Sequence, residues 1–436
     1  MHQLANSILI FDEIQTLPIK TIHLFNNAIN FLVQFCGSTV VLCTATQPLL
    51  NTVDKSLGAI LLDSNSKIIA DEHTLSASLR RTQIVDYCKN GGWTYNEVAA
   101  HTLQLLQENG SVLVIVNTKK SALNLYRILC NTPKAEVYHL STNMCPAHRK
   151  KTFSKIRLHL ETNQSQPIIC ISTQLIEAGV DIDFGSVIRF LAGLDSIAQA
   201  AGRCNRHGRN ENLAPVHVIN SVEENVNSLI DIIEGQKVTE RIFNDFNKNP
   251  DSMDNDLLSP KAMNIYYKYY FEARSEEMKY LLNPKSNPKI GCNTSLLELL
   301  SENKVFKSEY IRNNLDKFPE FHLHQAFDSA SQEFEVIDAP TSGVIVPYGE
   351  MGKQLIAELT AAFTNLESSK ETQKSLLRKS QHYAVNVFEN LLKELSKNDC
   401  LYQIKDTGIY CLDERYYNDE FGISIEETMK MTFLNL

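Results

Sequence analysis

The chain has 436 residues, of which 43% are hydrophobic and 21% are charged, and its formal net charge is −9. This length exceeds what one ordinary hydrophobic core organises, so we expect two or three domains of a soluble globular protein. The acidic balance excludes a surface coated in positive charge, but local basic clusters such as HRKK at 148–151 leave nucleic-acid binding open.

The cysteines and the hydropathy pattern indicate the cellular compartment of the protein. Ten cysteines are scattered without any CxxC pair, and several lie inside apolar runs such as VVLCTAT. Buried free thiols in a reducing cytosol explain this distribution better than disulfides or a zinc site. No apolar stretch is long enough to span a bilayer, and no signal sequence begins the chain. We therefore predict a cytoplasmic protein without a membrane partner.

The first predicted elements are two buried strands that end in polar residues. The stretch ILIFDEIQTLP at 8–18 predicts a strand over 8–11, with Asp12 and Glu13 at its carboxyl end. Open α/β sheets place ligands at such ends, so the two carboxylates favour metal and water chemistry on a nucleotide. The alternative is a solvated Asp that caps the next helix. The second strand, TVVLC at 39–43, is followed by TATQP.

Strands and helices alternate regularly from residue 95 to residue 220. Helices are predicted over 95–109, 119–131 and 146–161, and strands over 112–116, 135–140, 167–172, 186–192 and 215–220. This alternation is typical of βαβ units with right-handed crossovers, and it predicts a parallel sheet covered on both faces.

The chain changes character after residue 222. Connecting helices and a polar break at 249–260 precede a tyrosine-rich segment at 265–282, which we expect to be a packed helix rather than a base-stacking surface. The region from about 300 to 436 predicts a strand pair around FEVIDAPTSGVIVPYG and helices near 351–364 and 370–397.

The most specific pattern is QxxGRxxRxG at 199–208. Gln199, Arg203 and Arg206 are spaced by four and three residues, which predicts one shared helix face. No acidic residue lies between 196 and 210. We therefore expect unpaired donors that face an anion, with surface salt bridges as the alternative.

Four stretches, in their order along the chain, resemble the motifs of a known superfamily. DEIQ, TAT, TQxxEAGVD and QxxGRxxRxG resemble motifs II, III, V and VI of superfamily 2 nucleic-acid translocases. The resemblance implies that ATP lies between two RecA-like lobes. It implies that Asp12 holds Mg²⁺, that Glu13 activates the attacking water, and that Arg206 is the arginine finger. Arg203 and Gln199 would assist at the phosphates, and Gly179 and Asp181 of the EAGVD stretch would also contact the nucleotide.

The same resemblance assigns contacts to single-stranded DNA. Hydroxyl and basic groups in the motifs would hold phosphates without reading bases. Thr44 and Thr46 would couple nucleotide state to the grip on the strand. The implied nucleic-acid-binding residues are Thr44, Thr46, Thr118, Ser141, Arg149, Lys150, Ser172 and Thr173.

A finer resemblance extends beyond the motor motifs. FDEIQTLP, LCTATQP, STQLIEAGVDIDF and AQAAGRCNRHGR look like the CRISPR-associated helicase–nuclease of type I systems, particularly its I-C branch. RKSQHYAVNVFENLL and LDERYYNDEFG are similar to the C-terminal accessory region of that family. The resemblance implies three partners, which are single-stranded DNA, the Cascade-type surveillance complex and the N-terminal helicase and nuclease portion.

Two parts of that family have no counterpart here. The only Gly-Lys pair is Gly352–Lys353, far from the motor motifs, so no phosphate loop of the form GxxxxGK[ST] is present. The chain also lacks a His-Asp dipeptide. We therefore expect a truncated or split motor with an exposed sheet edge, and negligible ATPase and no nuclease activity from this chain alone.

The predicted fold is α/β, with RecA-like parallel-sheet lobes. A partial first lobe over 1–80 and a complete second lobe over 81–222 precede a helical linker over 223–298 and a small α+β C-terminal domain over 299–436. The predicted function is the C-terminal portion of an ATP-dependent 3′-to-5′ single-stranded DNA translocase of type I CRISPR interference. Two alternatives remain, an inactive fragment that docks on single-stranded DNA or the surveillance complex, and another superfamily 2 helicase.

Overall fold

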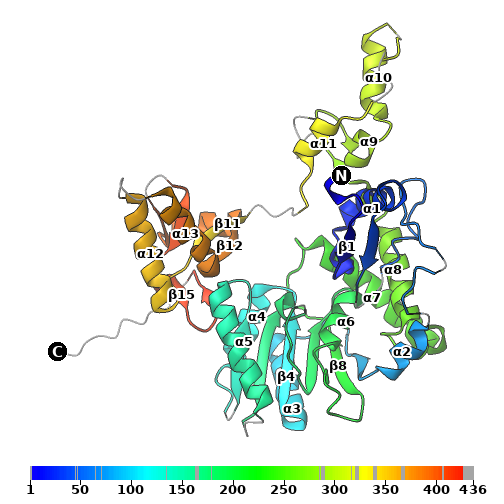
Figure 1. Cartoon of the computed structure of the whole chain (residues 1–436). Coiled ribbons are helices and arrows are strands. Elements are labelled where there is room, and N and C mark those ends of the chain that lie inside the picture. Colours follow the sequence, from blue (N-terminus) through cyan, green and yellow to red (C-terminus); the bar gives the residue numbers. More distant parts are fainter. Residues whose placement is uncertain are drawn as a thin grey trace. The chain divides into compact units, whose positions relative to one another are not determined.

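The computed structural model describes residues 2–425, except 45, 47, 64, 70, 134, 163–165, 178, 284, 286–289, 316, 320–323, 337–340, 365–368 and 405–406. The chain forms two compact units, Met1–Leu79 with Lys237–Asp338 and Arg80–Gln236 with Ala339–Leu436 (Figure 1). This grouping differs from the four consecutive segments expected from the sequence, because 299–338 falls in the first unit and 223–236 in the second.

The first unit contains a small parallel sheet. Strand β1 (Ile8–Phe11) pairs in parallel with β2 (Thr39–Leu42), and helix α1 (Ile22–Cys36) connects them. Helix α1 covers one face of the sheet, where the rings of Phe11 and Phe25 meet edge to face at 5.1 Å. Ile8 and Ile10, two alternate residues of β1, are 73% and 68% exposed. The sheet therefore has an uncovered apolar face, although parallel sheets are normally buried on both faces.

Helices make up most of the rest of the first unit. They are α2 (Glu72–Ser78), the end of α7 (Ile230–Lys248), α8 (Pro260–Ala273), α9 (Leu296–Leu299), α10 (Lys304–Asn313) and α11 (Phe327–Glu333), and a short pair β9 (Leu281–Leu282) and β10 (Thr294–Ser295) lies among them. Helix α8 carries the tyrosine-rich segment, and Tyr266, Tyr267 and Phe271 are only 1%, 3% and 8% exposed. The prediction of a packed helix is confirmed for 265–273, but the helix ends at Ala273, and a 3-10 helix and β9 follow instead of a continuous helix to 282.

The second unit is built on a six-stranded sheet in the order β3-β8-β7-β4-β6-β5, with every strand parallel. The strands are β3 (Thr82–Asp86), β4 (Ser111–Val116), β5 (Glu136–Leu140), β6 (Ile168–Thr173), β7 (Ser186–Phe190) and β8 (Ala214–Ile219). The predicted α/β class with a parallel sheet is confirmed. Strand β3 was not predicted, because a polar stretch surrounds it and, among the strands of the described residues, it pairs only with β8 at the edge of the sheet.

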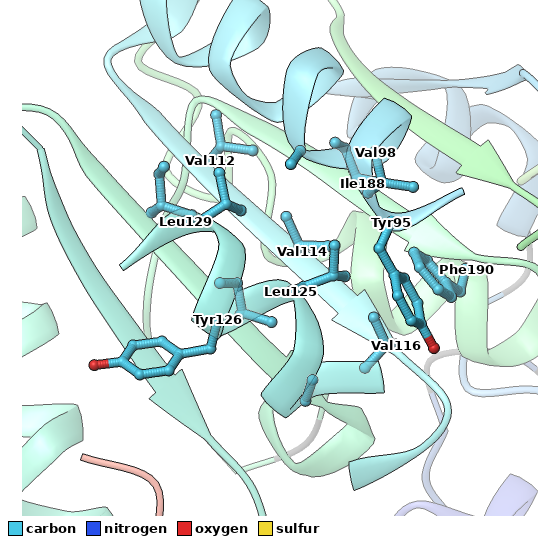
Figure 2. Packing of buried hydrophobic residues seen from close by; sticks show 14 of the residues in the cluster. Tyr95, Val98, Val112, Val114, Val116, Leu125, Tyr126, Leu129, Ile188 and Phe190 are labelled. Atoms are coloured by element: carbon cyan, nitrogen blue, oxygen red, sulfur yellow. The ribbon is translucent and has the colours of Figure 1, made fainter. Parts of the chain in front are cut away.

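Helices pack against both faces of this sheet. Helices α3 (Tyr95–Asn109) and α4 (Lys119–Leu129) cover one face, where alternate β4 residues Val112, Val114 and Val116 meet Val98 and Leu125 (Figure 2). The intervening β4 residues, Leu113 and Ile115, are also fully buried, so the other face is covered as well. The remaining helices are α5 (Pro146–Glu161), with the predicted bounds and Pro146 in its first turn, and α6 (Leu194–Ala201).

The C-terminal region of the second unit contains a four-stranded mixed sheet. Its order is β12 (Ala384–Phe388), β11 (Thr341–Ile345), β14 (Ile409–Leu412) and β13 (Leu401–Ile404). Helices α12 (Gly349–Thr364), α13 (Lys370–Ser380) and α14 (Glu389–Lys397) accompany it, with a short hairpin of β15 (Tyr417–Asn418) and β16 (Gly422–Ile423).

Two expectations for this region differ from the structure. In the stretch FEVIDAPTSGVIVPYG, β11 pairs with β12 and β14, and the described residues 334–336 are not in a strand, whereas residues 337–340 lie outside the described residues. The single helix predicted near 370–397 is interrupted by β12. The segment AVNVF has a period of two, with Val385 and Val387 buried on one side and Asn386 exposed on the other, which favours a strand.

Candidate functional site

Asp12 and Glu13 follow β1 directly, as predicted. The Asp12 side chain is exposed, and its Oδ1 accepts a hydrogen bond of 3.0 Å from the backbone N–H of Glu13. Glu13 has a φ of 54°, in the left-handed region that costs a residue with a Cβ about 1–2 kcal/mol. A side-chain cap is not observed on the short 3-10 helix Ile14–Thr16 that follows. The capping alternative for Asp12 is therefore not what the structure shows, and the unusual backbone favours a functional role for this turn.

The two strand ends of the first unit are joined by side-chain hydrogen bonds. Gln15 donates through Nε2 to the Glu13 carboxylate, and its Oε1 accepts from the Thr44 hydroxyl. Thr44 Oγ1 also lies 2.6 Å from the Thr46 carbonyl oxygen, and it accepts the Thr46 N–H at 3.1 Å. The DEIQ and TAT stretches therefore form one connected group. Gln15 is a residue that we did not predict as part of the site.

The EAGVD stretch follows β6 and a short 3-10 helix, Gln174–Ile176. Gly179 is exposed with a φ of +71°, a conformation that suits glycine, and Asp181 is also exposed. Glu177 is only 6% exposed and lies against the fully buried Arg189, with 2.8 Å between Oε1 and Nε. Burial raises the pKa of the Glu177 carboxyl, and the Arg189 guanidinium opposes that shift.

The predicted helix face of Gln199, Arg203 and Arg206 does not exist. Helix α6 ends at Ala201, so Gln199 lies in its last turn while the two arginines follow it. Arg203 is 7% exposed and donates to the backbone carbonyls of Ile176 and Glu177, with 2.9 Å from Nε to the Ile176 oxygen. The helix stops here because these bonds and a β-bridge between Phe184 and Cys204 hold the chain in another conformation.

Arg206 also differs from the expectation of unpaired donors. Its Nε donates to Asp181 Oδ1 at 2.7 Å, and both side chains are substantially exposed at 40% and 56%. The hydrogen bond to Arg206 lowers the pKa of Asp181. The acidic partner lies outside the window 196–210 in sequence, which is why the sequence did not reveal it. The structure therefore brings the EAGVD and QxxGRxxRxG stretches together.

A basic pocket of about 410 Å³ lies beside these stretches in the second unit, within the usual size range of ligand sites. It is lined by α5 residues, including Arg149, Lys150 and Arg157, and by the segment from Gly179 to Ile182. Burial lowers the pKa of Arg149. Arg157 was not predicted, and it forms an ion pair of 2.6 Å with Glu161.

The predicted hydroxyl contacts to DNA have partners of their own. Ser141 and Ser172 are fully buried, and Thr173 is 8% exposed. Ser172 donates to the Thr173 carbonyl oxygen at 2.8 Å. Thr118 caps α4 by accepting the Ser121 N–H. The assignment of these residues to DNA stays a prediction.

The same helix α5 is attached to the C-terminal region of the unit. The Tyr417 hydroxyl lies 2.9 Å from His148 Nδ1 and accepts the Cys145 N–H at 3.3 Å. The His148 ring stacks on Tyr348 with 4.2 Å between the centroids. Burial lowers the pKa of His148 to about 4, so this ring is neutral near pH 7. The start of the basic helix is therefore anchored by β15 and by the residues after β11.

The structure also bears on three other kinds of site: a phosphate loop, a metal site and a membrane span. Gly352 and Lys353 lie inside helix α12, and Lys353 pairs with Glu414, so they do not form a phosphate loop. Among the described residues, no group of three or more His, Cys, Asp or Glu side chains is arranged to hold a metal ion. Over the same part of the chain, helices with the length and hydropathy of a membrane span are absent.

Comparisons with known proteins agree with this arrangement. Residues 108–209 match the family model of the C-terminal part of the CRISPR-associated nuclease/helicase Cas3. Cas3 of Haloferax volcanii is 62% identical over 47 residues, which is 10% of this chain and 5% of that protein. Cas3 of Methanothermobacter thermautotrophicus is 32% identical over 113 residues, which is 26% of this chain and 13% of that protein.

A solved structure shows the same fold. The crystal structure of T. fusca Cas3 with ATP aligns with a TM-score of 0.54 and 15% sequence identity, over 91% of this chain and 48% of that one. The chain thus spans about half of that protein and less of the two sequence relatives. Together these matches confirm the predicted resemblance to the C-terminal portion of a Cas3 helicase.

Proposed function

We propose that this chain is the C-terminal portion of an ATP-dependent, 3′-to-5′ single-stranded DNA translocase of type I CRISPR interference. The observation that carries the proposal is the junction of two motifs. The matched residues 108–209 bring the EAGVD and QxxGRxxRxG stretches together at one end of a parallel sheet, through the Arg206–Asp181 pair.

The residues at the strand ends fit a nucleotide with Mg²⁺. Asp12 presents one exposed carboxylate, and Mg²⁺ is usually bound through one or two carboxylates and retained water. When bound, the nucleotide would supply the phosphoryl group that is attacked, and the ion would neutralise charge on the phosphates. Glu13 would take the proton of the attacking water, and Arg206 would stabilise negative charge. Gln199, Gly179 and Asp181 would support the nucleotide, and Arg203 would assist by fixing the segment that carries Asp181. T. fusca Cas3 has been solved with ATP, which supports nucleotide binding by this type of chain.

A segment with a phosphate loop completes this motor in our proposal. The uncovered apolar face of β1, at Ile8 and Ile10, offers that segment a place to pack. Turnover should appear when the segment is joined to this chain or added as a separate polypeptide. The surveillance complex is the further partner that the Cas3 resemblance suggests.

The test of the proposal is DNA-stimulated ATP hydrolysis by the assembled motor. This chain alone should hydrolyse ATP negligibly, because its sequence contains no GxxxxGK[ST] loop. The assembled motor should turn over with single-stranded DNA, and Glu13→Gln should retain ATP binding but lose hydrolysis. An assembled motor whose ATPase ignores both DNA and Glu13→Gln would contradict the proposal.

A second candidate function is supported by the basic pocket. This pocket lies wholly in the second unit and needs no phosphate loop, so the chain alone can dock on single-stranded DNA. Binding should lack sequence preference and weaken with salt, because phosphate contacts release counterions. Replacing Arg149 and Lys150 with Ala should lower the slope of log K against log salt by about 0.7 per lost contact. An unchanged slope would show that these two residues do not touch the strand.

A further inference from the structure

The connected group at the strand ends of the first unit extends to a distant helix. The Thr46 hydroxyl lies 2.9 Å from the hydroxyl of Tyr267 in α8, a residue 221 positions later in the chain. Thr46 and Tyr267 are 6% and 3% exposed. The bond therefore joins two buried groups, and removing one partner of a buried hydrogen bond costs about 1–3 kcal/mol.

Tyr267 is held firmly by its own helix. Helix α8 begins with the Ser259 hydroxyl accepting the Ala262 N–H at 3.1 Å, and Pro260 occupies its first turn. The Tyr267 ring packs against Phe271 at 5.7 Å between centroids. The hydroxyl is therefore presented to Thr46 from a rigid support, which suits a group that must position another.

The path from this hydroxyl to the Glu13 carboxylate is continuous. The Thr46 N–H donates to the Thr44 hydroxyl oxygen, the Thr44 hydroxyl donates to Gln15 Oε1, and Gln15 Nε2 donates to the Glu13 carboxylate. Each link is a hydrogen bond between described residues of one compact unit. Moving Thr46 therefore disturbs the acceptor that holds Gln15, and with it the carboxylate.

We propose that Tyr267 is a positioning residue, which fixes Thr46 against α8 and thereby sets the orientation of Glu13. The effect of Tyr267 on catalysis rests on the proposed function. The positioning of Thr46 by Tyr267 rests on the hydrogen bonds alone. Tyr267 does not touch the reacting atoms, and it acts through Thr46, Thr44 and Gln15.

The structural part is tested on the chain as it exists, by hydrogen exchange. Tyr267→Phe removes one oxygen atom and keeps the packed ring, so the chain should fold. The Thr46 amide, which donates to Thr44, should exchange about fivefold faster or more, as expected for losing a hydrogen bond of ordinary net strength. Thr46→Val should act similarly on Thr44 and its neighbours. Unchanged exchange at Thr46 in Tyr267→Phe would overturn the proposal.

The matched control lies two residues along the same helix. The Tyr269 hydroxyl donates to Asp245 Oδ2 at 3.3 Å, so Tyr269→Phe also removes a hydroxyl hydrogen bond from α8. It should leave exchange at Thr46 unchanged. Acceleration in both variants would show a general loosening of α8 and would count against a specific role of Tyr267.

The catalytic part is tested in the assembled motor. Tyr267→Phe should lower the kcat of DNA-stimulated hydrolysis about fivefold to tenfold and leave the KM for ATP within twofold, because orientation rather than binding is affected. The double variant Tyr267→Phe/Thr46→Val should be no slower than the slower single variant, since both remove the same bond. Absence of DNA-stimulated turnover in the parent motor would contradict the proposed function. The hydrogen-exchange measurement would still decide whether Tyr267 positions Thr46. An active parent with an unchanged kcat in Tyr267→Phe would refute the catalytic role.

Discussion

Replacing Arg189 with Met should destabilise the second unit strongly. Arg189 is fully buried, and its guanidinium donates to Asn117 Oδ1 and the Phe190 carbonyl oxygen at 2.7 Å and to Ser196 Oγ at 2.9 Å. Its Nε lies 2.8 Å from Glu177 Oε1. The variant leaves a buried carboxylate without its cation and removes three further hydrogen bonds. Removing one partner of a buried ion pair costs about 3–5 kcal/mol, and we expect a loss in that range.

The assay follows from the single tryptophan of the chain, Trp93, which lies in the second unit. Its indole N–H donates to the Tyr87 carbonyl oxygen at 2.8 Å, within the same unit. Unfolding of that unit breaks this contact and changes the surroundings of the ring, so Trp93 fluorescence during urea unfolding reports the unit. The double variant Glu177→Gln/Arg189→Met should recover most of the lost stability, since no unpaired charge remains. Arg157→Met is the control, because its exposed ion pair with Glu161 should leave the urea midpoint unchanged.

The pH dependence provides a second readout of the same pair. Burial raises the pKa of Glu177, and losing Arg189 should raise that pKa further. The folded form of Arg189→Met then binds a proton at Glu177 more readily than the unfolded chain does. Relative to the parent at the same pH, its unfolding free energy should therefore rise as the pH falls from 8 towards 5. A loss below about 1 kcal/mol, or a double variant as unstable as the sum of the single ones, would refute this reasoning.

Three further predictions concern other parts of the second unit. In the assembled motor, Arg206→Ala should lower DNA-stimulated turnover about 10³–10⁵-fold, whereas Arg209→Ala, from the same segment, should change it little. Equal turnover rates of the Arg206→Ala variant and the parent would exclude the role of Arg206 as the arginine finger. Gly422→Ala should lower the melting temperature, because its φ is +87° and a Cβ would lie 2.2 Å from the Asn143 carbonyl oxygen; an unchanged melting curve would contradict this close approach. The unit should lose stability as the pH falls from 6.5 towards 4. Burial lowers the pKa of His217 to about 4, so the unfolded chain takes up a proton at a higher pH than the folded one. A urea midpoint that stays constant over this pH range would contradict the prediction.

The core of the second unit could be predicted from the sequence because its signals are local and repeated. Strand β4 is a run of apolar residues, and helix α5 begins with Pro146, so both were placed within a residue of their bounds. The end of α6 could not be predicted in this way. Its last turn is decided by carbonyl groups near residue 176 that accept from Arg203, and nothing in the local spacing shows them.

The candidate site in the first unit was predicted in part. The strand ends at Asp12 and Thr44 follow from apolar runs that stop at polar residues. Gln15 could have been included, since it completes the DEIQ stretch three residues after Asp12. Tyr267 could not, because a packed aromatic helix looks the same whether one of its hydroxyls bonds to a motif or to water.

The arginines around the EAGVD segment differ in what they can do. Arg189 and Arg203 are buried and hold the Glu177 side chain and backbone, so moving either towards a phosphate would leave buried groups without partners. Arg206 is bonded to an exposed carboxylate, and water can replace that contact when the guanidinium moves. Among these three residues, Arg206 is therefore the one whose partner can be exchanged for a nucleotide phosphate, and Arg203 contributes by fixing the segment from which Asp181 extends.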